Sequence, residues 1–234
     1  MRSAGAAVKM FCKLSSQKFS RSCEGVEMGE GNGTEKIDGR RLRREQGRIA
    51  VVDAMIDLVL EGRTPPTADE VAARAGVSTA SVFRYFDSLD DLRRRGVQRY
   101  LERYDHLLDV PDLGEHGLSR RISALVEARQ RFYETIEPMA RLARSQALTV
   151  PELDDALGRL RATLADQLSE HFASELEGLR PVARRELVAV VAALTSYESW
   201  EQLRRHGLDR SAVGRALEQA VERIVRPDTA VTMQ

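Results

Sequence analysis

Long apolar runs are absent from this sequence. The longest, Leu187 to Leu194, is far shorter than the roughly 20 residues that a membrane-spanning helix needs. The N-terminus also lacks the hydrophobic core of a signal peptide, so the sequence predicts a cytoplasmic protein with no membrane partner. Cysteine is scarce as well, because Cys12 and Cys23 are the only two. Two cysteines so far apart, in a segment without helical or strand pattern, predict neither a disulfide framework nor a zinc site.

The motifs of common enzyme chemistry are missing too. The sequence contains no glycine-rich phosphate loop, no nucleophile elbow, no HExxH pair and no cluster of cysteine and histidine. The acidic pair Asp154-Asp155 has charged neighbours on a predicted helix, which indicates a solvated face. We therefore expect no enzymatic activity, no cofactor and no metal ion.

Charge of either sign is not in excess, since 36 Lys and Arg balance 36 Asp and Glu. A neutral total does not exclude nucleic acid, because the distribution of charge decides binding. Cations do gather before the first clear helical pattern. This basic arm, which is suited to neutralising phosphates, contains Lys36, Arg40, Arg41, Arg43, Arg44 and Arg48.

The spacing of apolar residues predicts an all-α fold. A first helix carries one apolar stripe at Ile49, Val52, Ile56, Val59 and Leu60. No alternating strand pattern bounded by turn residues occurs. The later predicted helices cover Leu118–Ile136 (ended by Pro138), Met139–Leu148, Glu152–Glu177, Pro181–His206 and Ser211–Val225. The predicted domains are a disordered extension (1–39), a three-helix DNA-binding domain (40–106), a helical ligand-binding and dimerisation domain (115–226) and a tail (227–234).

Residues 67–86 predict a helix-turn-helix. Thr67 and Glu70 form a capping box that begins one helix, Gly76 supplies the sharp turn, and Ser78 caps a second helix. The buried side of the second helix is predicted to be Val82, Phe83 and Phe86, and Ser88 with Asp91 caps the helix that follows. An ordinary helical corner is the alternative. The polar outer side of the second helix and the preceding arm favour an element that enters the major groove.

The segment Ala75 to Leu92 resembles the TetR family of bacterial transcriptional regulators. The resemblance implies base contacts from Thr79 and Ala80. It implies phosphate contacts from the start of the helix after Thr67, and from Ser81, Arg84 and Tyr85. Ser78, at the start of the second helix, is also placed in the DNA-binding set. Together with Arg41, Arg43, Arg44 and Arg48, these residues form the predicted DNA-binding set. Two positions depart from the family pattern: Phe83 stands where tyrosine is usual, and Leu89 where lysine is usual.

One helix-turn-helix contacts few base pairs, so useful specificity calls for a homodimer on a pseudo-palindromic operator. We expect the dimer surface to come from the apolar run 187–194 and from a stripe on the last helix. Burial of both helices within one chain is the alternative. The predicted stripe contains Val213, Leu217, Ala220, Val221 and Ile224.

The middle helices are the expected place for a small-molecule effector, because helical bundles hold ligands between helices. The candidate residues are Phe132, Tyr133, Met139, His171, Phe172, Tyr197 and Trp200. For each aromatic residue a plain core role is the alternative, and for His171 it is an exposed, solvated side chain. The sequence thus predicts a repressor that binds double-stranded DNA and is released by an effector. The competing hypothesis is a ligand-binding or interaction module of the same fold that has weakened or lost DNA binding.

Overall fold

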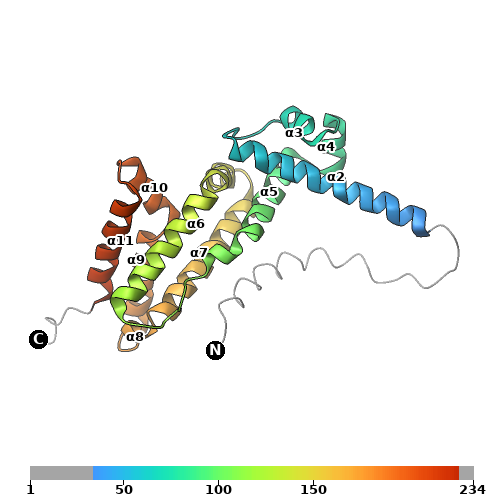
Figure 1. The fold of residues 1–234 in the computed structure, drawn as a ribbon. Helices are drawn as coiled ribbons and strands as arrows, with labels where there is room; N and C mark the ends of the chain where they lie inside the picture. Colours follow the sequence, from blue (N-terminus) through green and yellow to red (C-terminus); the bar gives the residue numbers. More distant parts are fainter. Residues whose placement is uncertain (1–33, 227–234) are drawn as a thin grey trace, which may run out of the picture. The chain divides into compact units, whose positions relative to one another are not determined.

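The computed structural model describes the backbone of residues 34–226 and the side chains of residues 39 and 41–226. Every regular element in this range is helical, which confirms the predicted all-α fold (Figure 1). Cys12, Cys23, the side chains of Lys36 and Arg40, and the predicted tail lie outside the described residues. The elements are α2 Thr34–Leu60, α3 Ala68–Ala75, α4 Thr79–Tyr85, α5 Leu89–Arg103, η1 Asp105–Leu108, α6 Leu118–Ala147, α7 Pro151–His171, α8 Ala173–Leu176, α9 Pro181–Leu194, α10 Tyr197–Arg205 and α11 Arg210–Val225.

The contacts between residues divide the described chain into two units. The first contains residues 34–103 together with Glu137–Leu157, and the second contains Tyr104–Ile136 together with residues 158–226. The division falls inside α6 and α7, so each of these helices contributes to both units. The domain limits predicted at 40–106 and 115–226 remain predictions.

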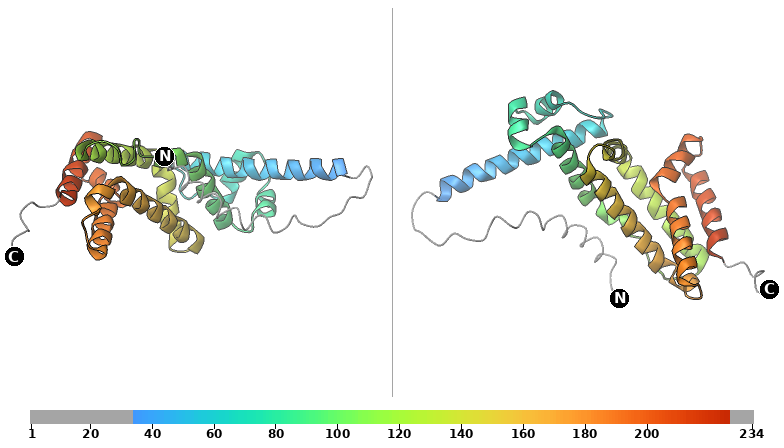
Figure 2. Two further views of the ribbon diagram at one scale, coloured as in Figure 1. Left: turned by 90° about the horizontal axis from the view of Figure 1, so that it is seen from below. Right: turned by 180° about the vertical axis from the view of Figure 1, so that it is seen from behind.

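Helix α2 is the centre of the first unit, where α3, α4 and α5 all pack against it. Its buried side chains include Val51, Val52 and Met55, whereas Ile49 and Leu60, predicted to be buried, are exposed. The helix also begins at Thr34, inside the segment predicted to be disordered. Adding residues to an existing helix costs little compared with nucleating one. The buried C-terminal half of α2 can therefore support a polar N-terminal half, which extends beyond α3 and α4 (Figure 2).

The approach of α5 to α2 depends on a glycine. A Cβ atom at Gly96 would lie 1.6 Å from the Cε of Met55, which is a core side chain of α2. Gly96 itself is buried. The absence of a side chain at Gly96 thus leaves room for the buried end of Met55, while the backbone conformation of Gly96 is ordinary helix.

Pro138 lies inside α6, although the sequence predicts that it ends a helix. A proline removes one backbone donor and crowds the preceding turn. The side chains around it are buried, among them Ile136, Met139 and Leu142. Burial of this apolar face outweighs the missing hydrogen bond and keeps the helix continuous.

Two long helices predicted from the sequence are each broken. The predicted helix Pro181–His206 is interrupted at Thr195-Ser196, where Ser196 caps α10 by accepting a hydrogen bond from the backbone N of Ser199. The predicted helix Glu152–Glu177 is interrupted at Phe172. At that break Arg121 donates to the backbone oxygen of His171, 2.5 Å away. At each break, a side chain forms a hydrogen bond with a backbone group that has no regular helical hydrogen-bond partner.

We predict opposite stability changes for alanine at two helical glycines. Gly158→Ala lies at an exposed position with nothing near its Cβ, so it should raise the free energy of unfolding by up to about 1 kcal/mol. Gly96→Ala has the same propensity gain but must displace Met55, so it should be net destabilising by about 1–3 kcal/mol. Urea unfolding followed by circular dichroism measures both. An equal gain at the two sites would contradict the packing role of Gly96.

Candidate functional site

The corner between α3 and α4 has the geometry predicted from the sequence. The Thr67 hydroxyl accepts from the backbone N of Glu70 at 3.3 Å, and the Glu70 carboxylate accepts from the backbone N of Thr67 at 2.9 Å. Gly76 ends α3 in the left-handed region, with φ 67°. Few residues other than glycine adopt this conformation without strain. The capping box and the turn glycine are therefore confirmed.

The next two helices begin as predicted. The Ser78 hydroxyl accepts from the backbone N of Ser81 at 3.2 Å and so caps α4. At α5, the Ser88 hydroxyl accepts from the backbone N of Asp91 at 3.1 Å. Each cap gives an otherwise unpaired helical N–H an acceptor. The caps thus set where the candidate recognition helix, α4, begins and where it is followed by α5.

The outer face of α4 is polar and accessible. Ala80 and Arg84 are exposed, and Thr79 is half-buried. The Thr79 hydroxyl donates to Asp69 at 2.7 Å, so its methyl group and its remaining lone pairs are what it can present outward. The Arg84 guanidinium donates to the Ser81 hydroxyl at 3.0 Å. Both hydrogen bonds hold polar side chains of α4 in defined positions at the surface.

Phe83 differs from the sequence prediction. It was predicted to be buried with Val82 and Phe86, yet only those two are buried, and Phe83 is 52% exposed. Val82 lies on the inner face of the seven-residue helix, and Phe86 follows the helix as its C-cap, in extended backbone conformation. Phe83 is rotated by about 100° from Val82 around the helix, which places it off the inner face. The accessible face of α4 therefore includes an aromatic ring, which can contact thymine methyl groups or sugars.

Tyr85 and Arg48, both in the predicted DNA-binding set, make packing contacts within the first unit. A Cβ atom at Gly47 would lie 2.7 Å from the Tyr85 hydroxyl oxygen, so this ring lies close against α2. The Arg48 guanidinium stands over the Phe86 ring at 5.7 Å and is 3.6 Å from Glu45. Arg48 is therefore at least in part a structural residue. Among the side chains of α2 that the structure describes, the exposed cations are Arg41, Arg43 and Arg44.

Acidic groups beside α3 are paired within the unit. Glu61 and Arg74 form an ion pair at 2.7 Å, and the hydrogen bond from Arg74 lowers the pKa of Glu61. The backbone N–H of Thr67 lowers the pKa of Glu70, which also pairs with Arg63 at 3.1 Å. These carboxylates stay ionised but have cationic partners close by. Such pairing reduces their repulsion of a polyanion.

The effector candidates predicted from the sequence are all buried, and four of them form one aromatic cluster. The Tyr133 ring lies 5.7 Å from that of Tyr197 and 6.0 Å from that of Trp200, and the last two are 5.5 Å apart. Phe132 is 5.6 Å from Tyr133. The Tyr133 hydroxyl donates to the backbone oxygen of Thr195 at 2.7 Å. The other three candidates are not in this cluster: Met139 belongs to the first unit, and His171 contacts Phe172 elsewhere in the second.

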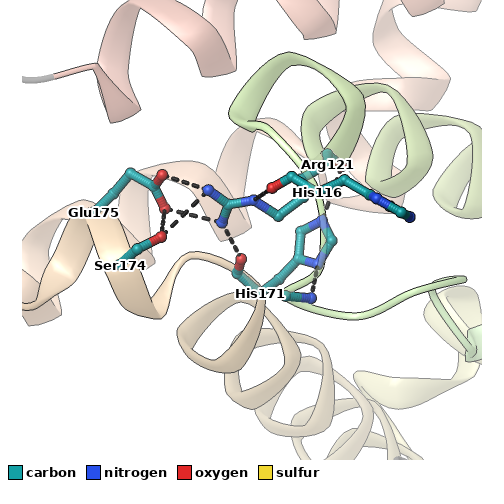
Figure 3. A network of polar contacts seen from close by, with 6 residues as sticks. His116, Arg121, His171, Ser174 and Glu175 are labelled. Atoms are coloured by element: carbon teal, nitrogen blue, oxygen red, sulfur yellow. Dashed lines mark hydrogen bonds and ion pairs between the residues drawn. The ribbon is translucent and has the colours of Figure 1, made fainter.

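His171 is fully buried, so the expectation of a solvated histidine is wrong. Figure 3 shows the polar contacts of its ring. Its Nδ1 accepts from the backbone N of Gly114 at 3.0 Å, which leaves Nε2 to donate to the backbone oxygen of Arg121 at 2.8 Å. Arg121 pairs with Glu175 at 2.5 Å and donates to the backbone oxygen of His116 at 3.2 Å. This network ties the loop before α6 to the end of α7, and no solvent contact of His171 remains.

The ionisation of the network follows from its burial. Burial lowers the pKa of His171, and the positive charges of Arg121 and Arg129 lower it further. The hydrogen bond to the backbone oxygen of Arg121 and the charge of Glu175 oppose this lowering without cancelling it. Burial raises the pKa of Glu175, but the hydrogen bonds from Arg121 and Ser174 outweigh it, and the net pKa is lowered. The folded state thus favours a neutral histidine beside an ionised Arg–Glu pair.

One group of side chains in the described chain could approach a metal ion. Donor atoms of Asp112, Glu115 and His116 lie within 4.8 Å of one another on an exposed loop. His116 and Asp112 already form a hydrogen bond at 3.2 Å. Exposed acidic groups of this kind are common without a metal, so we assign no ion to them.

We predict that the neutral state of His171 makes stability depend on pH. Below the ordinary histidine pKa of 6.5, the unfolded chain binds a proton that folded His171 does not accept. The free energy of unfolding should therefore fall as pH decreases from 7 to about 5. The lowered pKa of Glu175 adds a loss only below its ordinary value of 4.5. His171→Gln should flatten the slope above pH 5, and the exposed control His206→Gln should not. Urea unfolding at each pH tests this, and an unchanged slope in His171→Gln would refute it.

No helix among residues 34–226 combines the length and the apolar character needed to cross a bilayer.

No curated protein sequence matches the chain. Solved structures do match it. The multidrug binding protein EbrR, solved with imidazole, is 21% identical with a TM-score of 0.57, and the match covers 78% of this chain and 97% of EbrR.

Two further structures support the same fold. A candidate transcriptional regulator from Streptomyces coelicolor A3(2) is 22% identical, covering 78% of this chain and 99% of that one, with a TM-score of 0.53. A candidate TetR-family transcriptional regulator from Mesorhizobium loti MAFF303099 is 16% identical, covering 78% and 96%, with a TM-score of 0.56. These similarities establish a shared fold across most of the chain.

Sequence similarity is concentrated at the corner described above. Residues 64–95, which contain α3, the turn and α4, match the family model described as bacterial regulatory proteins of the tetR family. The resemblance predicted from the sequence is thereby confirmed. The chain therefore carries the helix-turn-helix of the TetR family of bacterial regulatory proteins.

Proposed function

We propose that this protein is a cytoplasmic transcriptional regulator, not an enzyme, that binds a pseudo-palindromic operator as a homodimer and is released by a small-molecule effector. The observation that carries the proposal is α4. Its caps hold it at the surface, and its outer face offers Thr79, Ala80 and Arg84. Regulators of this type insert such a helix into the major groove.

The contacts expected from α4 divide by chemistry. Ala80 and the Thr79 methyl group are small and apolar enough to approach base edges. Arg84 has charge without a fixed base partner, and it should bind phosphate and position the protein. Phe83 adds an apolar contact that the sequence did not predict. The exposed Arg41, Arg43 and Arg44 extend the cationic surface along α2.

The competing hypothesis is a module of the same fold without DNA binding. Phe83 and Leu89 favour it, because they replace a phosphate-binding hydroxyl and a cation. The exposed Arg84 and the arginines of α2 count against it, because they keep positive charge on the same unit. We therefore prefer the DNA-binding regulator.

We predict that Arg84→Ala weakens DNA binding and reduces its salt dependence. Duplexes enriched by the protein from a random pool provide the ligand, and fluorescence anisotropy measures affinity at several salt concentrations. Because each subunit of the variant neutralises one phosphate fewer, the slope of log affinity against log salt should fall by roughly two per dimer. Arg131→Ala, an exposed arginine of the other unit, is the charge-matched control and should bind as the wild type does. Failure to enrich any sequence, or binding insensitive to salt, would favour the module without DNA binding.

A dimer surface on α9 is supported by exposed apolar side chains. This helix is strongly apolar, yet only Val191 is buried, while Val182 is 56% and Val190 is 47% exposed. Contiguous exposed apolar surface is typical of protein interfaces, and these two valines are the reason for placing the dimer contact on α9. The stripe predicted on α11 contributes less than expected. Val213, Leu217 and Val221 are buried within the chain itself, and Ala220 and Ile224 are half-buried.

We predict that Val190→Glu converts the dimer to a monomer. A carboxylate placed in an apolar interface loses hydration without gaining a partner. Leu148→Glu is the matched control, because Leu148 is 92% exposed and lies in the connection after α6. Sedimentation equilibrium should give monomers for Val190→Glu and dimers for Leu148→Glu and the wild type. A dimer that survives Val190→Glu, or a monomeric wild type, would reject this interface.

The aromatic cluster supports an effector site in the second unit. Among the described residues, Trp200 Nε1 and Gln130 Oε1 are buried without a hydrogen-bond partner. Buried polar atoms are nearly always paired in folded proteins, and a bound molecule would supply the partner. A protein of similar fold, EbrR, is described as multidrug binding. An effector there would change the affinity for DNA by binding one conformation better than another.

A further inference from the structure

Arg129 of α6 is a buried cation without a counter-charge. Its side chain is 2% exposed. One guanidinium nitrogen donates to Gln167 Oε1 at 3.0 Å, and the other donates to the backbone oxygen of Leu164 at 3.2 Å. Both acceptors are neutral, and no ion pair found within the described part of the chain includes Arg129. The fold thus hydrogen-bonds this charge but does not neutralise it.

Arg121, earlier on the same helix, is a buried arginine that does have an acidic partner. It pairs with Glu175 at 2.5 Å. Buried charges without a partner are costly, and proteins rarely retain them. Burial lowers the pKa of Arg129, and its charge in turn helps to lower the pKa of His171. The interior near Arg129 therefore contains a positive charge that no described acidic side chain neutralises.

Arg129 lies next to the aromatic cluster, through Tyr133. Tyr133 is one helical turn away and close enough to act electrostatically on the guanidinium. Its ring contacts Trp200, whose indole N–H is buried and has no acceptor among the described residues. The second unit thus brings together the Arg129 cation, the aromatic rings of Tyr133 and Trp200, and the Trp200 indole N–H, which has no acceptor in the described chain.

We propose that Arg129 is the counter-ion of an organic monocarboxylate with an aromatic or apolar body, and that such a carboxylate is the effector. This inference rests on the regulator function proposed above. The planar guanidinium suits a carboxylate in a two-point contact. A monoanion balances the single charge, whereas a dianionic phosphate leaves negative charge uncompensated. The body of the ligand packs against Tyr133 and Trp200.

Gln167 connects this position to the segment that follows α5. Its Oε1 accepts from Arg129, while its Nε2 donates to the backbone oxygen of Leu108 at 3.0 Å. Leu108 ends η1, which comes directly after α5 in the chain. A carboxylate that takes the place of Gln167 Oε1 on Arg129 moves the amide that holds Leu108. Effector binding thereby acts on the chain next to the helix-turn-helix unit.

The test uses the single tryptophan of the chain, Trp200, as its reporter. Phenylbutyrate, its amide and phenylbutylamine share one body and differ in charge. Quenching of tryptophan fluorescence in the full chain should show saturable binding of phenylbutyrate, tighter than either analogue by about ten-fold or more. Arg129→Gln should reduce phenylbutyrate binding to the level of the amide. Arg131→Gln, an exposed arginine on the same helix, removes the same charge and should keep the preference.

Three results would overturn the proposal: no saturable binding of phenylbutyrate, equal binding of the amide, or an unchanged preference in Arg129→Gln. Thermal unfolding of each variant shows whether a loss of binding reflects a loss of the folded structure. Arg121→Gln breaks an ion pair and should lower Tm clearly, whereas Arg129→Gln should lower it less or raise it. A fall as large as that of Arg121→Gln would make Arg129 a structural residue and reject the proposal.

DNA binding separates this inference from the proposed function. Phenylbutyrate should release the enriched duplex from the wild type but not from Arg129→Gln. Fluorescence binding that needs Arg129 without release of DNA would keep the anion site and reject the effector role. A protein that binds no duplex would reject the regulator, while the fluorescence series still decides the anion site.

Discussion

The candidate DNA interface depends on the packing of three short helices against α2. Helices α3 and α4 are too short to be stable alone, so their positions are set by the apolar side of α2 and by caps at their ends. Gly96 lets α5 approach Met55, and Gly47 lets Tyr85 lie against α2. Val82 on the inner side of α4 and Phe86 directly after the helix are both buried, so the polar side of α4 faces solvent.

The second unit depends on how buried charges are satisfied. Arg121 has Glu175 and two backbone oxygens as partners, and this network holds the loop before α6 against the end of α7 (Figure 3). Arg129 has neutral acceptors only. The same residue type on one helix thus has two different surroundings. The surroundings of Arg121 are those of a structural ion pair. The surroundings of Arg129 suit a cation whose charge is neutralised by a bound ligand.

The sequence predicted best what is decided locally. The caps at Thr67, Ser78 and Ser88 and the turn at Gly76 depend on neighbours within four residues, so short motifs were enough to identify them. The predictions that Phe83 is buried, that His171 is solvated and that one helix runs from Pro181 to His206 were wrong, because tertiary contacts decide these features. The aromatic cluster could be anticipated only as separate candidates, and Arg129 not at all, because no local pattern marks a cation that distant helices remove from solvent.

The division of the chain limits how a ligand in the second unit can affect the first. The backbone passes between the units after Arg103, after Ile136 and after Leu157. The passage after Ile136 lies within α6, and the passage after Leu157 lies within α7. Pro138 removes one backbone hydrogen bond of α6 just after the passage at Ile136. The passage after Arg103 is followed by η1, which Gln167 holds through Leu108. Arg129 is therefore connected to two of the three passages, to one along α6 and to the other through Gln167. This gives a bound anion a physical route to the unit that carries α4.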